Sequence, residues 1–234
     1  MLNLKTRSGA VAFVLMALAG AANADVVVTN LAEPFRATTE VGNNPNPVMP
    51  PSGAPLWSWA AQSFITDGAS YALTQIDIIG GEASLAPAPV IVAELRADNA
   101  GTIGALITTL VIPDMTGPVA PRGLTPSVPV TLDPSTTYWI VLGSQAPGDG
   151  TLGWSYANSN ESVGTGVIAQ YADSQDSGAT WNYGTEFPYF IQVVAEPSTA
   201  CTPCPGDANG DLVVNFDDIT EVLARWLNSC APAR

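Results

Sequence analysis

The chain of 234 residues contains no histidine, and its only lysine is Lys5. The absence of histidine excludes Ser-His-Asp and Cys-His nucleophile pairs, and it excludes zinc sites with histidine ligands. The absence of any later lysine excludes Schiff-base chemistry and a phosphate-binding P-loop from the body of the chain. Any catalysis would therefore have to depend on carboxylates, tyrosine, arginine or calcium.

Long hydrophobic runs are also absent. A basic pair, Lys5 and Arg7, precedes a short apolar run at residues 11–18, and the sequence ANA at 22–24 has the form of a cleavage site. Residues 1–24 are therefore predicted to be a signal peptide. The run is too short to span a membrane, and no other stretch approaches about 18 apolar residues. We expect a secreted protein, extracellular or in the cell envelope, with no transmembrane span after signal removal.

Positive charge is scarce in the chain that remains. Without Lys5 and Arg7 it carries five arginines against 21 acidic residues, a formal net charge of −16. Nucleic-acid binding needs a basic surface, so this balance excludes it, and it equally disfavours docking on an anionic membrane. We therefore expect an extracellular structural or binding function that does not involve nucleic acid.

What the sequence does contain is a series of short β-like segments separated by glycine, proline and asparagine turns. This spacing predicts an antiparallel β-sandwich, jelly-roll-like, over residues 25–195. A proline-rich stretch at 41–55 is expected to be a loop. The predicted strands are 25–31, 61–66, 71–79, 90–96, 105–112, 128–132, 137–142, 152–156, 166–171 and 189–194.

A short Pro/Ser/Thr linker at 196–206 leads to a second predicted module at 207–230. The sequence DANGDLVVNFDD at 207–218 places oxygen ligands at positions 1, 3, 5, 7, 9 and 12 of a twelve-residue loop, which is the spacing of an EF-hand calcium site. The predicted Ca²⁺ ligands are Asp207, Asn209, Asp211, Val213 through its carbonyl, Asn215 and Asp218.

A helix is expected to follow this loop directly. Apolar residues at 219, 222, 223, 226 and 227 fall on one face of a helix. Asn215 is a favourable N-cap, and Asp218 three residues later resembles a capping box. The same two residues would thus serve both the metal and the start of the helix.

Three cysteines lie around the loop. Export makes a disulfide reasonable, and a Cys204–Cys230 bridge would join the two ends of the module. Closing a loop of that size contributes about 3–4 kcal/mol in the chain-entropy model. Cys201 paired with either of the other two is the alternative, and zinc bound by cysteine alone is a minor one. One thiol is left over in every pairing.

The tail resembles a type I dockerin repeat. The pattern D-x-N-G-D, followed by a hydrophobic residue, Asn and then Asp at position 12, carries the resemblance. Leu212 stands where that pattern has glycine, and the chain has one repeat where a full dockerin has two. The resemblance implies calcium binding and attachment to an envelope or scaffold protein.

The body is similar to the choice-of-anchor R family of secreted bacterial proteins. The segments that carry the similarity are AQSFIT at 61–66, YALT at 71–74, VAEL at 92–95 and TTYWIVL at 136–142. Such families join one β-domain to alternative sorting or anchoring tails. The similarity implies a surface location and no particular reaction.

Sugar contact is a separate hypothesis. The sequence SQDSGATW at 174–181 has the Asp-box pattern, which we interpret as a hairpin turn in which Asp176 bonds turn amides and Gly178 adopts an unusual φ. Aromatic side chains can stack on sugar rings. Trp154, Trp181 and Tyr183 are the candidates, because they are the aromatic residues least securely placed inside a predicted strand.

Together these observations predict a non-enzymatic secreted or cell-surface β-protein with a calcium-binding, dockerin-like tail. The alternative is a carbohydrate-binding accessory module, or a carboxylate-dependent glycoside hydrolase, delivered through the same tail. With 21 acids and no spaced motif, no carboxylate pair is singled out for hydrolysis.

Overall fold

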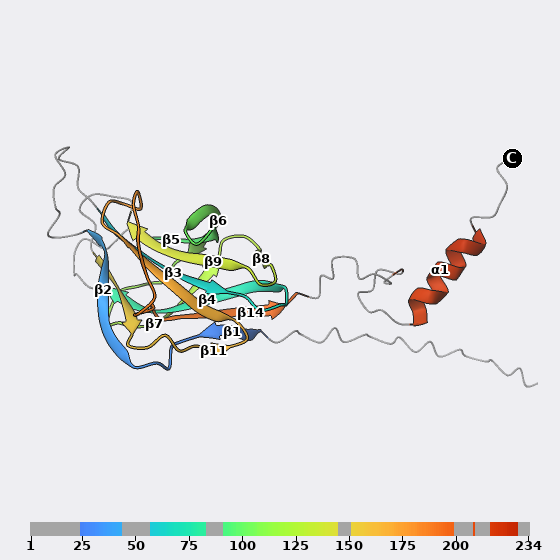
Figure 1. Cartoon of the computed structure of the whole chain (residues 1–234), viewed down its shortest axis with the longest axis horizontal. Helices are drawn as coiled ribbons and strands as arrows, with labels where there is room; N and C mark the ends of the chain where they lie inside the picture. Colours follow the sequence, from blue (N-terminus) through green and yellow to red (C-terminus); the bar gives the residue numbers. More distant parts are fainter. Residues whose placement is uncertain are drawn as a thin grey trace, which may run out of the picture.

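The computed structural model describes residues 24–43, 57–82, 91–144, 151–198, 208 and 216–228. Within these residues the fold is mainly β, with one helix, α1 (Phe216–Asn228), close to the C-terminus. The strands build an antiparallel closed barrel of eight strands with further strands outside it (Figure 1). None of the described segments includes a helix that is both long and apolar enough to cross a membrane.

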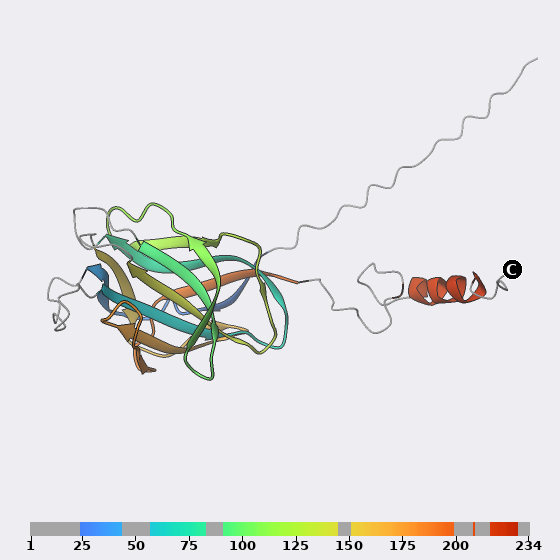
Figure 2. The same cartoon turned by 90° about the horizontal axis from the view of Figure 1, so that it is seen from above.

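The barrel closes because each of its eight strands pairs antiparallel with two neighbours. Figure 2 shows the strands wrapping round a common interior. In order round the barrel they are β2 (Phe35–Asn43), β3 (Trp57–Ile65), β9 (Thr137–Ser144), β5 (Ile91–Asp98), β6 (Ile103–Val111), β7 (Ala120–Pro126), β4 (Tyr71–Glu82) and β10 (Thr151–Ala157).

The remaining strands extend two of the barrel strands outward. β4 also pairs with β14 (Ile191–Pro197), which continues through β1 (Asp25–Thr29) to β11 (Val163–Gly164). The short β8 (Thr131–Leu132) pairs with β4 as well. β3 pairs with β12 (Val167–Ser174), which forms a hairpin with β13 (Asn182–Gly184).

The predicted antiparallel all-β fold is confirmed, but one closed barrel replaces the two separate sheets of a sandwich. Two short junctions account for the difference. β2 joins β3 through Gly42 opposite Ser58, and β6 joins β7 through Val111 opposite Thr125. Gly42 has φ +118°, a backbone conformation that favours glycine and allows β2 to reach β3. Without these junctions the two halves would be facing sheets.

Most predicted strands are present. Two strands that the sequence did not predict, β2 and β7, have sequences that do not favour a strand. β2 follows a weakly apolar sequence and runs three residues into the predicted loop at 41–55. β7 contains Pro121 and Pro126, which argued against a strand, yet it pairs with β4 through five residues. The helix expected after residue 215 is observed as α1.

The barrel interior holds the main hydrophobic core. Because side chains alternate along a strand, Ile140 and Leu142 of β9 point into this core while Trp139 and Val141 point outward. The outward pair is also buried, in a second cluster with Trp59 and Trp181 packed beside it. β9 is therefore covered on both faces, which explains its continuous apolar sequence. The largest fully buried side chains are Trp139, Trp154, Tyr189, Phe64, Phe190, Ile76, Ile78, Leu95, Leu124, Leu132, Ile140 and Leu142.

Candidate functional sites

Ala208 and Asp218, at positions 2 and 12 of the predicted calcium loop, are among the residues that the structure describes. Asp218, at position 12, is only 2% exposed, and its Oδ1 accepts a hydrogen bond from the amide of Ala208 at 2.8 Å. This contact brings positions 2 and 12 of the predicted loop together. In a calcium loop, position 12 supplies a carboxylate ligand.

The other predicted calcium ligands lie outside the described residues. They are Asp207, Asn209, Asp211, Val213 and Asn215, and the disulfide candidates Cys204 and Cys230 lie outside as well. Within the parts of the chain that are described, no three His, Cys, Asp or Glu side chains lie close enough to hold a metal ion. The chemistry of the predicted donor set, five side-chain oxygens and one carbonyl, fits calcium.

The helix that follows presents an apolar face to solvent. Ile219, Val222 and Leu223 belong to the predicted stripe, and about half of each side chain is exposed. Phe216, at the start of α1, is exposed too. An exposed apolar face on a short helix suits docking against another protein.

A second site, not predicted from the sequence, is an aromatic pocket in the barrel. We call it the tyrosine pocket, and its volume is about 130 Å³. It lies where β2, β10 and β12 meet the segment that leads into β14. Its lining residues are Thr39, Tyr156, Tyr171, Asp173, Phe187 and Tyr189.

Tyr189 forms the buried centre of the tyrosine pocket. Its ring stacks on Trp154, with centroids 4.5 Å apart, and meets the rings of Tyr156 and Tyr171 edge-on at 6.0 and 6.2 Å. Its hydroxyl donates a hydrogen bond to Oδ1 of Asp173 at 2.5 Å. Three tyrosine rings and one carboxylate thus share a small volume.

Two buried amide side chains fix the backbone of Tyr189. Oε1 of Gln62 accepts a hydrogen bond from the Tyr189 amide at 2.8 Å, and Nδ2 of Asn30 donates to the Tyr189 carbonyl at 3.1 Å. Asn30 also accepts from the amide of Ile191. Satisfied buried amides of this kind hold a backbone rigidly, so the position of the Tyr189 ring is set before any ligand arrives.

The electrostatics of the tyrosine pocket follow from its burial. Desolvation raises the pKa of Asp173, and the hydrogen bond from Tyr189 offsets part of that shift. Desolvation also raises the pKa of Tyr189, and the negative charge of Asp173 raises it further. The pocket therefore contains a carboxylate whose charged form is poorly solvated, beside a Tyr189 hydroxyl that stays protonated.

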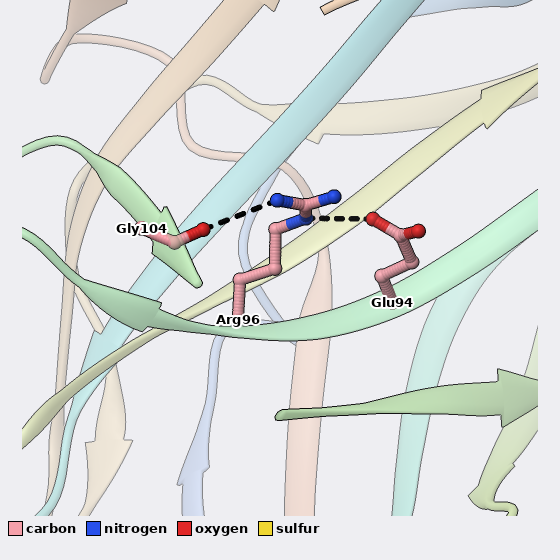
Figure 3. Close-up of polar contacts among 3 residues, drawn as sticks. All are labelled: Glu94, Arg96 and Gly104. Carbon is pink, nitrogen blue, oxygen red and sulfur yellow. Dashed lines mark hydrogen bonds and ion pairs between the residues drawn. The ribbon is translucent and has the colours of Figure 1, made fainter. Parts of the chain in front are cut away.

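Two arginines of the body have partners in the protein, and one of them lies over a ring of the tyrosine pocket. Arg96 donates through Nε to Oε2 of Glu94 at 2.6 Å and through Nη1 to the carbonyl of Gly104 at 3.1 Å (Figure 3). Arg36 donates to Oδ1 of Asn158. Its guanidinium carbon lies 3.7 Å from the ring centroid of Phe187.

The Asp-box interpretation as a hairpin turn is confirmed, because residues 174–181 connect β12 to β13. Asp176 accepts hydrogen bonds from the amide and the hydroxyl of Thr180 at 2.8 and 2.5 Å, and these bonds lower its pKa. Gly178 has φ +79°. Ser177 beside it also has a positive φ, so the turn requires left-handed backbone at two successive positions.

The three aromatic candidates for sugar contact differ in how exposed their side chains are. Trp154 is 0% exposed and donates through Nε1 to the carbonyl of Phe190, so it has no free ring face and its prediction as a sugar contact is not supported. Trp181 is half-buried in the outer cluster. Tyr183 is 39% exposed, its ring meets Trp139 edge-on, and its hydroxyl accepts from the amide of Ile103.

One signal for the tyrosine pocket is present in the sequence. Tyr171 and Asp173 are two residues apart on a strand and therefore share a face, whereas Ala172 between them packs in the outer cluster. Comparison of the sequence with models of protein families and with curated proteins gives no match.

Proposed function

We propose that this is an exported, non-enzymatic protein whose β-barrel is attached or assembled through a calcium-ordered C-terminal module. The observation that carries the proposal is the position of Asp218, buried at the last site of the loop and bonded to Ala208. Calcium would be held by side-chain oxygens of Asp207, Asn209, Asp211, Asn215 and Asp218 and by the carbonyl of Val213.

The module would act by coupling metal binding to folding. Without a metal, four carboxylates at positions 207, 211, 217 and 218 repel one another within twelve residues. Calcium neutralises them, fixes the loop and holds the start of α1, which then presents the apolar face of Ile219, Val222 and Leu223. The resemblance to a dockerin repeat supports an envelope or scaffold protein as the partner for that face.

Chelation tests this proposal directly. We expect EGTA to abolish slow amide hydrogen exchange in α1 while exchange in the barrel strands stays unchanged, because the metal orders only the tail. Asp217→Asn, which removes a charge from an exposed position that is not a ligand, is the matched control for Asp218→Asn. Identical protection of α1 in calcium and in EGTA would refute the proposal.

Carbohydrate binding is the second candidate function, and one observation favours it. Trp181 and Tyr183 lie two residues apart on the β13 arm of the β12–β13 hairpin, and Tyr183 is accessible. A pull-down on insoluble polysaccharide would test it, with Tyr183→Leu expected to weaken retention and Trp154→Phe, at a buried site, as the control. Release of reducing sugar in the same assay would indicate the glycoside hydrolase alternative. Equal retention of both variants would refute a role for this surface.

A further inference from the structure

The tyrosine pocket combines aromatic faces with one negative charge. Tyr156, Tyr171 and Tyr189 contribute rings, and Asp173 contributes a half-buried carboxylate. Phe187 also lines the pocket, and the guanidinium of Arg36 lies over its ring. Aromatic rings attract cations through the negative potential over their faces, and this attraction grows when water is excluded. A carboxylate at the same site adds a direct Coulomb attraction.

The charge of Asp173 is not balanced by the protein. Among the described residues the hydrogen bond donated by Tyr189 is the only partner of this carboxylate, and the one ion pair joins Arg96 to Glu94. Burial raises the pKa of Asp173 and the hydrogen bond from Tyr189 lowers it in part, with no contribution from a positive charge. A ligand cation in the pocket would supply the missing countercharge.

The size of the pocket limits what can enter. A volume of about 130 Å³ is close to the roughly 150 Å³ of a cavity that accommodates benzene. One compact group of that size fits, such as a trimethylammonium head. The fixed backbone of Tyr189, held by Gln62 and Asn30, means that little conformational freedom is lost when the group binds.

We infer that the tyrosine pocket binds a methylated or quaternary ammonium group, with the partly exposed rings of Tyr156 and Tyr171 facing its methyl groups, the buried ring of Tyr189 behind them and Asp173 pairing with its charge. This inference does not rest on the calcium module, because every residue that carries it lies in the β-strands of the body or in the segments that connect them.

The chemistry favours an ammonium group over the other ligands of the same size. A hard metal ion needs six or more oxygen ligands, and the pocket offers one carboxylate with a few hydroxyls. A neutral sugar ring needs several hydrogen-bond donors and acceptors arranged around it, whereas most of this lining is aromatic. The protein's formal net charge of −14, which becomes −16 without the signal peptide, also attracts cations over longer distances.

The test is an NMR titration of the mature full-length protein with choline and with 3,3-dimethyl-1-butanol, its neutral analogue of the same shape. We expect choline to shift the aromatic resonances of the pocket and to bind about tenfold more tightly than the alcohol. Vesicles of phosphatidylcholine form a further arm, which distinguishes a lipid headgroup from a free ammonium compound. Equal binding of choline and the alcohol, or no binding of either, would overturn the inference.

Single substitutions distinguish the contribution of the carboxylate to choline binding from the contribution of the aromatic rings. Asp173→Asn keeps an acceptor for the Tyr189 hydroxyl and is expected to weaken choline binding about tenfold with no change for the alcohol. Tyr171→Leu is expected to weaken it about fivefold through loss of a ring face. Glu161→Gln, which removes an exposed carboxylate outside the pocket lining, is the control and should change binding by less than about twofold. Unchanged binding by Asp173→Asn would refute the site, and persistence of choline binding in EGTA would show that it is independent of the tail.

Discussion

Gln62 is expected to be one of the most sensitive polar positions in the protein. Its side chain is 0% exposed and makes three hydrogen bonds. Nε2 donates to the carbonyls of Ser63 and Gln170 at 3.0 and 2.9 Å, and Oε1 accepts from the amide of Tyr189 at 2.8 Å. Replacement by methionine keeps a similar volume and removes all three bonds.

The magnitude follows from which groups lose their partners. The carbonyl of Gln170 keeps the hydroxyl of Ser63 as a donor at 2.9 Å, so it stays satisfied. The buried amide of Tyr189 loses the side-chain acceptor that Gln62 gives it, at a cost of about 1–3 kcal/mol, and the other lost bonds add to this. We expect Gln62→Met to reduce the free energy of unfolding by about 2–3 kcal/mol.

The assay is urea unfolding followed by circular dichroism in excess calcium. Gln192→Met is the matched control, because Gln192 is half-buried and its side chain donates one hydrogen bond, to Asp77 at 3.0 Å. It should cost less than about 1 kcal/mol. If Gln62→Met were within about 0.5 kcal/mol of the wild type, the argument that Gln62 holds Tyr189 in place would be wrong.

Three further predictions concern single side chains. Asp173→Asn should stabilise the protein at pH 7 but not at pH 3. Because the pKa of Asp173 is raised in the folded protein, the folded state binds more protons than the unfolded state, and the wild type loses stability as the pH rises past the ordinary carboxyl value. An equal difference between variant and wild type at both pH values in urea melts would contradict this. Asp176→Ala removes the acceptor for Thr180 and should cost about 1 kcal/mol at pH 7. Because the pKa of Asp176 is lowered, that difference should vanish as the pH falls through the folded-state value, and a constant difference would count against it. Trp154→Phe leaves the carbonyl of Phe190 without its indole donor and should cost about 1–3 kcal/mol in thermal unfolding, whereas an unchanged melting temperature would show that the bond is unimportant.

Local sequence patterns predicted the β-strands and the helix well, because alternation and helical periodicity are local signals. The turn at 174–181 was equally predictable, since Asp176 and Gly178 occupy the positions that the turn requires. The closure of the barrel was not predictable in the same way. It depends on pairings such as Gly42 with Ser58, and short pairings between distant strands leave no periodic trace in a sequence.

The tyrosine pocket was missed for a related reason. Its residues come from three strands and a connecting segment, and the aromatic residues chosen from the sequence were those outside confident strands. Trp154 was chosen on that basis, yet its strand is part of the barrel wall and its ring is in the core. The residues that fix the pocket, Asn30 and Gln62, carry no motif, and their importance appears only when Tyr189 lies between them.

The central claim is that one calcium ion is bound by the C-terminal loop, and calorimetric titration of the mature full-length protein tests it most directly. The account predicts a saturable heat with one Ca²⁺ per chain that is lost in Asp218→Ala and retained in Asp217→Asn. No heat at millimolar Ca²⁺, or the same heat in Asp218→Ala, would contradict it.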